Sequence, residues 1–511
     1  MLFLFSVICH LPYILGEKYM ADILTILQEP DFKKVVEILC VDTQSDRNPK
    51  EYLDEYNGKR ERREGSVDNR EDKQVDIYSD TETEVNEDGD EVPKKIGTET
   101  VVVAKIHTNY PKKIVRTAVA FMFGGDMSIT ADEENDGIKY FEKVFSKGLK
   151  MKSVLKKFAR TVFVETKAAL LFYPREVILP SGKASELRVR LLSIKNGEIF
   201  PHFDDYGDMD AFVRKYVATV AEDEGKEHDH VQIYTADNII TAIDMGGSWV
   251  QTVEKNLFGK IPVVYAEVEE PEWEDIVTAL DRIEMRLSRL SDTNDYFSEP
   301  ILKSYGATNL PSKKTVGKQI EFEMNTDDDG NVTHGDADYL TWQQTIEAIK
   351  LELDMLKAEI LGGTSTPDLT FDNVKGIGSV TGVAMKLMFL DAFLKAADNM
   401  EVFEPAVARC VSVIKAGICN ITNIAYSSQL LENDIDVLFG TVLPDDLREE
   451  MEILSIANGG KPINARRTVT ARSRFTKDVD EELKQMQDED KVDAENNSLL
   501  GMTFNPGNKE E

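Results

Sequence analysis

Apolar positions near the start of the chain recur at helical spacing. From Asp22 to about Tyr56 this spacing is interrupted near Pro30 and Pro49, which predicts a series of short helices. The stretch over residues 68–95 that follows is polar and rich in charge, and we expect an exposed loop or hairpin there.

The next part of the chain alternates between helical and extended patterns. An apolar run predicts a buried helix over Ile114–Phe123 that ends at Gly124-Gly125, and Phe141–Phe163 is also expected to be helical. These segments predict an α+β body that extends to about residue 265. The expected strands, which are separated by turn residues, are Thr100–Ile106, Ala168–Pro174, Leu187–Ile194, Val231–Thr235 and Asn238–Ile243.

Two later segments each carry one apolar seam with steps of three and four residues. The first extends from Glu272 to Asn294 and would form a helix roughly 35 Å long. Because both seams allow side-by-side packing, we expect two long helices flanking an insert that projects from the body. The seams consist of Trp273, Ile276, Leu280, Ile283, Leu287 and Leu290, and of Trp342, Ile346, Ile349, Leu353, Leu356 and Ile360.

The C-terminal third is expected to be mainly helical. A third long helix is predicted from Val380 to about Tyr426, and a further helix over Asp445–Ala457. An acidic helix should begin at Asp478, and the last dozen residues are expected to be disordered. The third helix has a broad apolar face that predicts burial on several sides, namely Val383, Leu387, Leu390, Phe393 and Leu394.

The charge balance limits the kinds of partner the protein can have. The 511 residues include 60 Lys and Arg and 93 Asp and Glu, a formal net charge of -33. A sequence-independent DNA clamp needs a basic stripe that neutralises phosphates, and the sequence has none. The basic cluster of Arg466, Arg467, Arg472 and Arg474 could contact nucleic acid or pair with the acidic tail.

The N-terminal segment is a poor candidate for a membrane anchor. Met1 to Leu15 is apolar, but it contains His10 and Pro12 and is shorter than the roughly 20 residues a membrane-spanning helix requires. No basic residue precedes the apolar run, as a signal peptide would require. We therefore expect no membrane contact, and we interpret residues 1–19 as an upstream extension before Met20.

Several motifs, in matching order along the chain, resemble the portal (connector) family of long-tailed bacteriophages. The resemblance extends from about residue 50 to residue 485. It departs from the family pattern in the apolar extension and in the acidic stretch from Asp76 to Glu91. The segments that carry it are Tyr52–Lys59, similar to "YxxYxxGK"; Asn109–Val115 with Thr117–Val119 and Phe123-Gly124; Phe258–Val264, similar to "GxIPVV"; Asp292–Pro300, similar to "NxYFxxP"; and Pro367–Val374 with Ser379–Lys386.

This resemblance implies an α+β, mainly helical portal fold and a ring of typically twelve copies at one capsid vertex. It implies a virion protein assembled in the host cytoplasm, a conduit for DNA packaging and ejection, and no catalytic activity or cofactor. The implied partners are other copies of the chain, the terminase large subunit, a head-completion or adaptor protein, the major capsid and scaffolding proteins, and double-stranded DNA in the tunnel. The implied divisions are a wing (residues 20–265), a first stem helix (266–296), a clip (297–339), a second stem helix (340–363), a tunnel loop (364–380), a long wing helix (381–430), a crown (431–490) and a disordered tail (491–511).

Two sets of residues are candidates for the conduit and docking functions. In the tunnel loop we expect Asp368, Asp372 and Asn373 to lie near the DNA and keep the contact weak, with Lys375 as one transient phosphate partner. In the clip, the basic residues expected to face terminase or an adaptor are Lys303, Lys313, Lys314 and Lys318.

Other patterns leave alternatives open. Residues 325–336 partly match a calcium loop but are also typical of a hairpin turn. The run Glu227–His230 could bind a metal or form a polar loop. The glycines at 376, 378 and 382 favour a flexible loop over a dinucleotide site, and no GxxxxGK[ST] sequence occurs. The four cysteines lack CxxC spacing and are expected to be reduced, with no zinc site.

Two other classes of protein compete with the portal interpretation. Another head or tail connector should lack the two seamed helices that flank an insert. A nuclease or packaging ATPase would need a nucleotide loop or a metal–carboxylate cluster, and neither is identifiable in the sequence.

Overall fold

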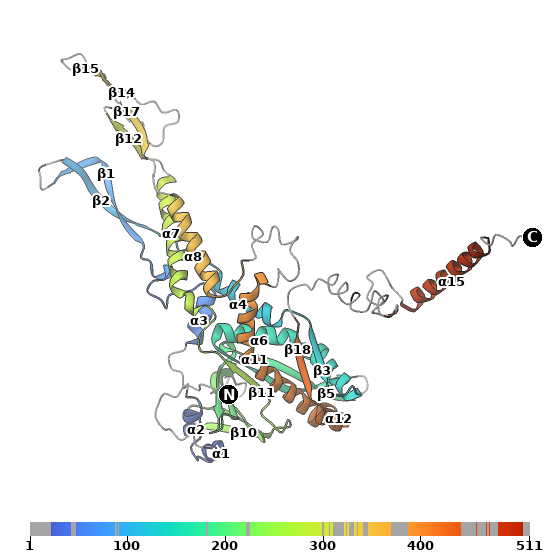
Figure 1. Cartoon of the computed structure of the whole chain (residues 1–511). Helices are drawn as coiled ribbons and strands as arrows, with labels where there is room; N and C mark the ends of the chain where they lie inside the picture. Colours follow the sequence, from blue (N-terminus) through green and yellow to red (C-terminus); the bar gives the residue numbers. More distant parts are fainter. Residues whose placement is uncertain are drawn as a thin grey trace, which may run out of the picture. The chain divides into compact units, whose positions relative to one another are not determined.

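The structure is a computed structural model of the whole chain (Figure 1). It divides into two units, residues 1–375 with 388–442 and residues 376–387 with 443–511. The upstream extension expected at residues 1–19 lies outside the described residues. The residues described are 22–41, 48–86, 89, 91–179, 182–220, 225–298, 301–305, 307–309, 321–322, 324–326, 332–334, 336–340, 346–368, 387–440, 456, 465, 467, 470 and 479–503.

The predicted series of short N-terminal helices is confirmed. The three helices are α1 (Ile23–Ile26), α2 (Phe32–Leu39) and α3 (Pro49–Tyr56). Each begins after a side chain that caps a free backbone N–H group, and the interruptions near Pro30 and Pro49 separate them as expected. The capping residues are Asp22, Asp31 and Asn48.

The polar stretch after these helices forms the expected hairpin. Strand β1 (Lys73–Val85) pairs in antiparallel with β2 (Glu91–Val101), after a short 3-10 helix, η1 (Val67–Asn69). The expected strand Thr100–Ile106 is wrong beyond Val101. Its backbone N–H groups donate instead to side chains, among them Asp292 and Ser288 of a later helix, so no strand partner is needed there.

A helical layer forms the next part of the body. The expected helix over Ile114–Phe123 is present and begins one turn earlier. The helix expected over Phe141–Phe163 is interrupted by a π-helical turn over Lys143–Gly148 and by Lys150, whose φ is 54°. Phe123, Phe158 and Phe163 each pack edge-on against Phe403, and each buried ring stabilises the layer by roughly 1.5–3 kcal/mol. The helices of this layer are α4 (Tyr110–Phe123), α5 (Asp136–Glu142), α6 (Met151–Glu165) and α11 (Leu390–Gly417).

Two antiparallel sheets lie beneath this helical layer. A core that includes Leu171, Phe212 and Val263 joins the sheets, and a second core packs α1 and α2 on the outer face of the larger sheet. The smaller sheet has the order β11-β4-β5 and the larger β10-β9-β8-β7-β6. The strands are β4 (Lys167–Leu179), β5 (Gly182–Leu192), β6 (Glu198–Phe203), β7 (Met209–Thr219), β8 (Glu227–Tyr234), β9 (Asn238–Asp244), β10 (Trp249–Lys255) and β11 (Val263–Glu267).

The two seamed segments form helices that pack side by side (Figure 1). A 3-10 turn, η5 (Glu274–Ile276), leads into α7 (Val277–Ser298), and the second helix is α8 (Ile346–Gly363). Seam residues from both helices are buried, but Ile346 is 73% exposed and Trp342 lies outside the described residues. The buried seam residues are Trp273, Ile276, Leu280, Ile283, Ile349 and Ile360.

Short antiparallel strands occupy the insert between α7 and α8. Strand β12 pairs with β17, β13 with β14, and β15 with β16. In the last pair Asn325 lies opposite Thr333, so paired strands flank the partial calcium motif. Asp327, Asp329 and Gly330, on which the choice between a calcium loop and a hairpin turn depends, lie outside the described residues. The bounds are β12 (Ile301–Tyr305), β13 (Ala307–Asn309), β14 (Glu321–Phe322), β15 (Met324–Thr326), β16 (Val332–His334) and β17 (Asp336–Leu340).

The long helix expected from Val380 to about Tyr426 differs from the prediction. After α11 the chain continues as a π-helical turn over Ile418–Thr422, a 3-10 turn over Ile424–Tyr426 and α12 (Ser427–Leu431). The prediction that this helix is buried on several sides is wrong for a single chain, because Leu390 and Leu394 are 47% and 57% exposed. The opposite face of α11 supplies the core contacts, and residues 380–386 lie outside the described part of the chain.

The last elements modify two further expectations. Strand β18 (Ile435–Phe439) pairs in antiparallel with β3 (Met127–Ala131), so the first unit continues past the expected crown boundary at residue 431. Helix α15 (Val479–Thr503) is the acidic helix expected from Asp478, and it continues into the tail expected to be disordered, as far as residue 503. The expected helix over residues 445–457 lies almost entirely outside the described residues.

Candidate functional site

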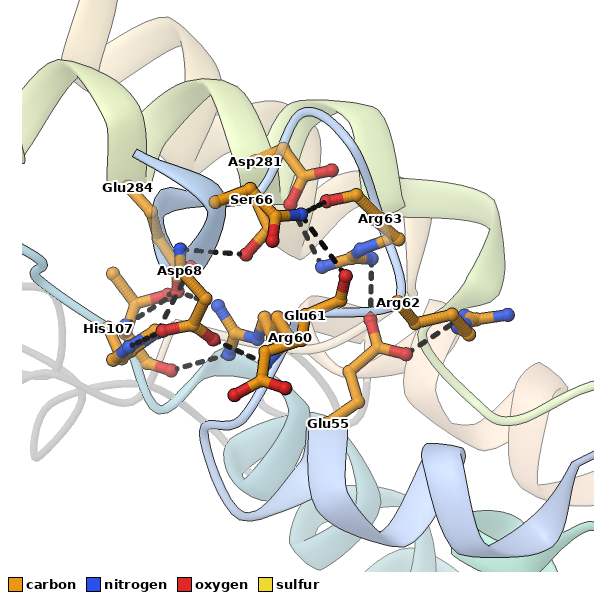
Figure 2. Close-up of polar contacts among 12 residues, drawn as sticks. Glu55, Arg60, Glu61, Arg62, Arg63, Ser66, Asp68, His107, Asp281 and Glu284 are labelled. Carbon is orange, nitrogen blue, oxygen red and sulfur yellow. Dashed lines mark hydrogen bonds and ion pairs between the residues drawn. The ribbon is translucent and has the colours of Figure 1, made fainter. Parts of the chain in front are cut away.

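Helix α7 has a polar face in addition to its apolar seam. Asp281, Glu284, Ser288 and Asp292 follow one another at steps of three, four and four residues, so they lie along one side of the helix. The loop that follows α3 lies against this face and supplies basic side chains (Figure 2). We call the resulting set of ionisable side chains, whose centre is buried, the α7 ion-pair cluster: Glu55, Arg60, Arg62, Arg63, Asp68, Arg70, His107, Asp281, Glu284 and Asp292.

Arg60 and Glu284 form the buried centre of this cluster. Their side chains are 1% and 0% exposed and form an ion pair. Arg60 also donates to the carbonyl oxygen of Thr108 at 2.9 Å, and Glu284 accepts from the Thr108 N–H at 2.6 Å and its hydroxyl at 2.7 Å. Burial, together with the neighbouring Arg63, lowers the pKa of Arg60 to about 10, so its guanidinium stays charged at neutral pH.

A second group connects α3 to the start of α7. Glu55, which is 1% exposed, accepts from Arg62 at 2.9 Å and lies 2.5 Å from Arg63. Arg63 in turn lies 2.9 Å from Asp281. Burial raises the pKa of Asp281, an effect that Arg63 partly offsets. These contacts join α3 and the loop that follows it to α7, which lies more than two hundred residues later in the chain.

The far end of the cluster contacts residues 102–109, which are neither helix nor strand. Arg70 donates to Asp292 at 2.5 Å, and Asp292 also accepts from the Ala104 N–H at 2.7 Å. Burial would raise the pKa of Asp292, but these two donors outweigh it and hold the pKa below its usual range. His107 Nε2 lies 3.0 Å from Asp68. The cluster thus fastens the N-terminal segments along the polar face of α7.

Among the predicted tunnel residues, the structure describes Asp368. Its carboxylate lies 2.7 Å from Lys357 Nζ of α8 and 3.3 Å from Lys113 Nζ of α4. Burial would raise the pKa of Asp368, but the hydrogen bonds from Lys357 and Lys113 hold it below the ordinary value. The carboxylate therefore joins α4 to α8, and its charge is compensated. Asp372, Asn373 and Lys375 lie outside the described residues.

The predicted docking and metal residues are only partly described. Lys303 lies in β12 opposite Asp338 of β17, whereas Lys313, Lys314 and Lys318 lie outside the described residues. The interpretation of Glu227–His230 as a polar loop is wrong, because these residues begin β8.

The histidines of that run have separate surroundings. His230 is buried and stacks on Tyr216, with ring centroids 5.2 Å apart, and His228 Nδ1 lies 2.8 Å from the Asp244 carbonyl. No group of three metal-ligating side chains occurs among the described residues. Searched over the same residues, no helix has the length and apolar character needed to cross a membrane.

The α7 ion-pair cluster was not among the predicted sites. The basic run from Lys59 to Arg63 is visible in the sequence, but a charge run is usually a solvated surface. The available signal was the polar stripe on α7, because a helix with an apolar seam and a second regular stripe of acidic and hydroxyl residues needs a polar partner. Arg467, from the basic cluster, pairs with Asp480 of α15 at 2.9 Å, in line with the alternative of pairing with the acidic tail.

In the described part of the chain these charged groups pair with one another and join separate elements. A family model described as "Phage portal protein, SPP1 Gp6-like" matches residues 98–496. The chain belongs to this phage portal family, and the resemblance inferred from its motifs is confirmed. A comparison with curated proteins gives no match. The matched range includes α7 and α8 but begins after Arg60 and the other arginines of the cluster.

Proposed function

We propose that this chain is the subunit of a portal ring, of typically twelve copies, at one capsid vertex. In this role it is a conduit for DNA packaging and ejection and has no catalytic activity. The clip between α7 and α8 receives the terminase large subunit during packaging and a head-completion protein afterwards, with Lys303, Lys313, Lys314 and Lys318 as the basic contacts. The capsid and scaffolding proteins surround the ring. The match to the portal family over residues 98–496 carries this proposal.

An exposed apolar stripe on α8 supports the ring. Leu351 and Met355 are 62% and 64% exposed and lie one turn apart on the side of α8 that faces away from its seam with α7. Ala348 and Ala358, which are also exposed, extend the stripe by one turn at each end. A contiguous apolar surface of this kind is typical of a protein interface, and in a ring a neighbouring copy covers it.

Electron microscopy of the purified full-length chain tests the proposal directly. We expect closed rings with a central hole, because head-to-tail contacts between identical copies close when the rotation between neighbours divides the circle. A chain that forms only compact particles without a central channel, across a range of concentrations and salt, would contradict the portal role.

The acidic character of the chain supports weak contact with the DNA in transit. Strong contacts with the phosphates would slow DNA, which must pass through the conduit regardless of its base sequence. The tunnel loop should therefore repel the DNA or hold it only briefly. Asp368 is already paired with two lysines, which makes Asp372 the better residue to test.

Replacing Asp372 with Lys should slow DNA packaging in an in vitro assay with terminase, about tenfold if one phosphate contact of roughly 1.4 kcal/mol is gained per subunit. Asp372→Asn is the matched control, since it removes the charge without adding an anchor, and it should package nearly as the wild type does. An unchanged packaging rate for Asp372→Lys would count against the tunnel assignment.

A further inference from the structure

A basic recess lies on the wing body, in a chain whose net charge is -33. It encloses about 520 Å³ and is lined by β5, β7 and the 3-10 turn η3 (Ile194–Asn196) that follows β5. Three of its lining residues are cationic: Arg190, Lys195 and Arg214. We call it the Arg214 recess. None of the residues used in the proposed portal role lines it.

Arg214 is held in a defined position within this recess. It is 6% exposed, and its guanidinium donates to the Asn196 carbonyl at 2.8 and 3.2 Å and to Gln232 Oε1 at 3.3 Å. The guanidinium carbon lies 4.0 Å from the centroid of the Tyr216 ring, which in turn stacks on His230. These contacts order the side chain but do not neutralise its charge.

The local backbone is built to allow this arrangement. Gly197 follows the turn with a φ of +124°, and a Cβ atom there would lie 2.5 Å from the Lys215 carbonyl oxygen. Only glycine therefore lets the turn approach β7 closely enough for the Asn196 carbonyl to meet Arg214.

The cations of the recess lack acidic partners. Among the described residues, Arg190, Lys195 and Arg214 form no ion pair with a carboxylate, whereas the arginines of the α7 ion-pair cluster do. Burial and the neighbouring Arg190 both lower the pKa of Arg214. Lys195 acts electrostatically on Glu165, but that buried carboxylate already accepts the Ile194 N–H at 2.9 Å. A buried cation without an anionic partner is costly, and an external anion would remove this cost.

We propose that the Arg214 recess binds a carboxylate side chain from an acidic peptide segment of a partner protein. Arginine matches a carboxylate through paired N–H donors, which the exposed Arg190 can supply beside the buried charge of Arg214. The recess has room for one or two side chains rather than a long polymer. This inference goes beyond the portal role and does not depend on it.

The test measures binding of a fluorescein-labelled hexaglutamate peptide to the full-length chain by fluorescence anisotropy at constant ionic strength. We expect wild-type protein to bind hexaglutamate and not hexaglutamine. The double variant Arg190→Gln/Lys195→Gln, which changes exposed side chains, should weaken binding by at least about tenfold, because it removes two cations that can form charge-assisted hydrogen bonds with the peptide. Lys143→Gln/Lys147→Gln is the matched control, since it removes two exposed lysines outside the recess, and its affinity should stay within about twofold of wild type.

A thermal-shift measurement separates binding at Arg214 from general charge effects. Hexaglutamate should raise the Tm of the wild type, because a ligand that binds only the folded state stabilises it. It should not change the Tm of the Arg214→Met variant. The proposal is overturned if wild type shows no binding, if the matched control weakens binding as much as the recess variant, or if a ten-nucleotide single strand binds the recess in preference to the peptide.

Discussion

Replacing Glu284 with Gln should destabilise the first unit by about 3–5 kcal/mol, the cost expected when one partner of a buried ion pair is removed. Arg60 is 1% exposed and has Glu284 as its ion-pair partner, so the change leaves a buried guanidinium without its counter-charge. The backbone N–H of Thr108, which donates to the same carboxylate, would also lose a charged acceptor. Urea unfolding monitored by tryptophan fluorescence can measure this loss. Trp273 is buried just before the turn that leads into α7, and its ring packs against Tyr56 of α3.

An exposed ion pair between α7 and α8 provides the control. Arg282 and Glu352 also form an Arg–Glu ion pair, but Arg282 is 53% exposed, so Arg282→Gln should cost at most roughly 1 kcal/mol. The double variant Arg60→Met/Glu284→Gln should recover a large part of the loss, because it removes both charges together. Equal costs for Glu284→Gln and Arg282→Gln would show that the α7 ion-pair cluster does not fasten the N-terminal segments.

Placing two aspartates on the exposed α8 stripe should abolish ring formation while leaving the subunit folded. In Leu351→Asp/Met355→Asp, both carboxylates would have to be desolvated against a neighbouring copy, at a cost of at least several kcal/mol per interface. The isolated subunit has no such cost, because both side chains are more than half exposed. Light scattering coupled to size exclusion measures the assembly, and far-UV circular dichroism reports the fold.

Two controls isolate the role of the stripe. Leu351→Met/Met355→Leu keeps the surface apolar and should form rings as the wild type does. Leu24→Asp/Ile38→Asp adds the same charge at two exposed positions of α1 and α2 and should also form rings. Intact rings from the stripe variant would mean that this side of α8 does not contact a neighbour.

The local patterns of the sequence determined much of the fold. The three-and-four spacing of the two seams predicted α7 and α8, and the breaks near Pro30 and Pro49 separated α1, α2 and α3. These features depend on contacts within one turn or on the period of burial, which the order of residues records directly. The motif order along the chain likewise identified the family, which the match over residues 98–496 confirms.

Long-range contacts decided which charged side chains are buried and which groups compensate them. Whether Arg60 is a solvated charge or a buried one depends on Glu284, which lies more than two hundred residues later, and no local pattern records that pairing. The same holds for Asp368, whose compensation by Lys113 and Lys357 appears only when α4 and α8 come together, and for Arg214, whose lack of an acidic partner follows from the sheet register. Hydrophobic periodicity sets which face of an element is buried, but the partner of a buried charge is set by tertiary packing, because electrostatic compensation requires proximity in space rather than in sequence.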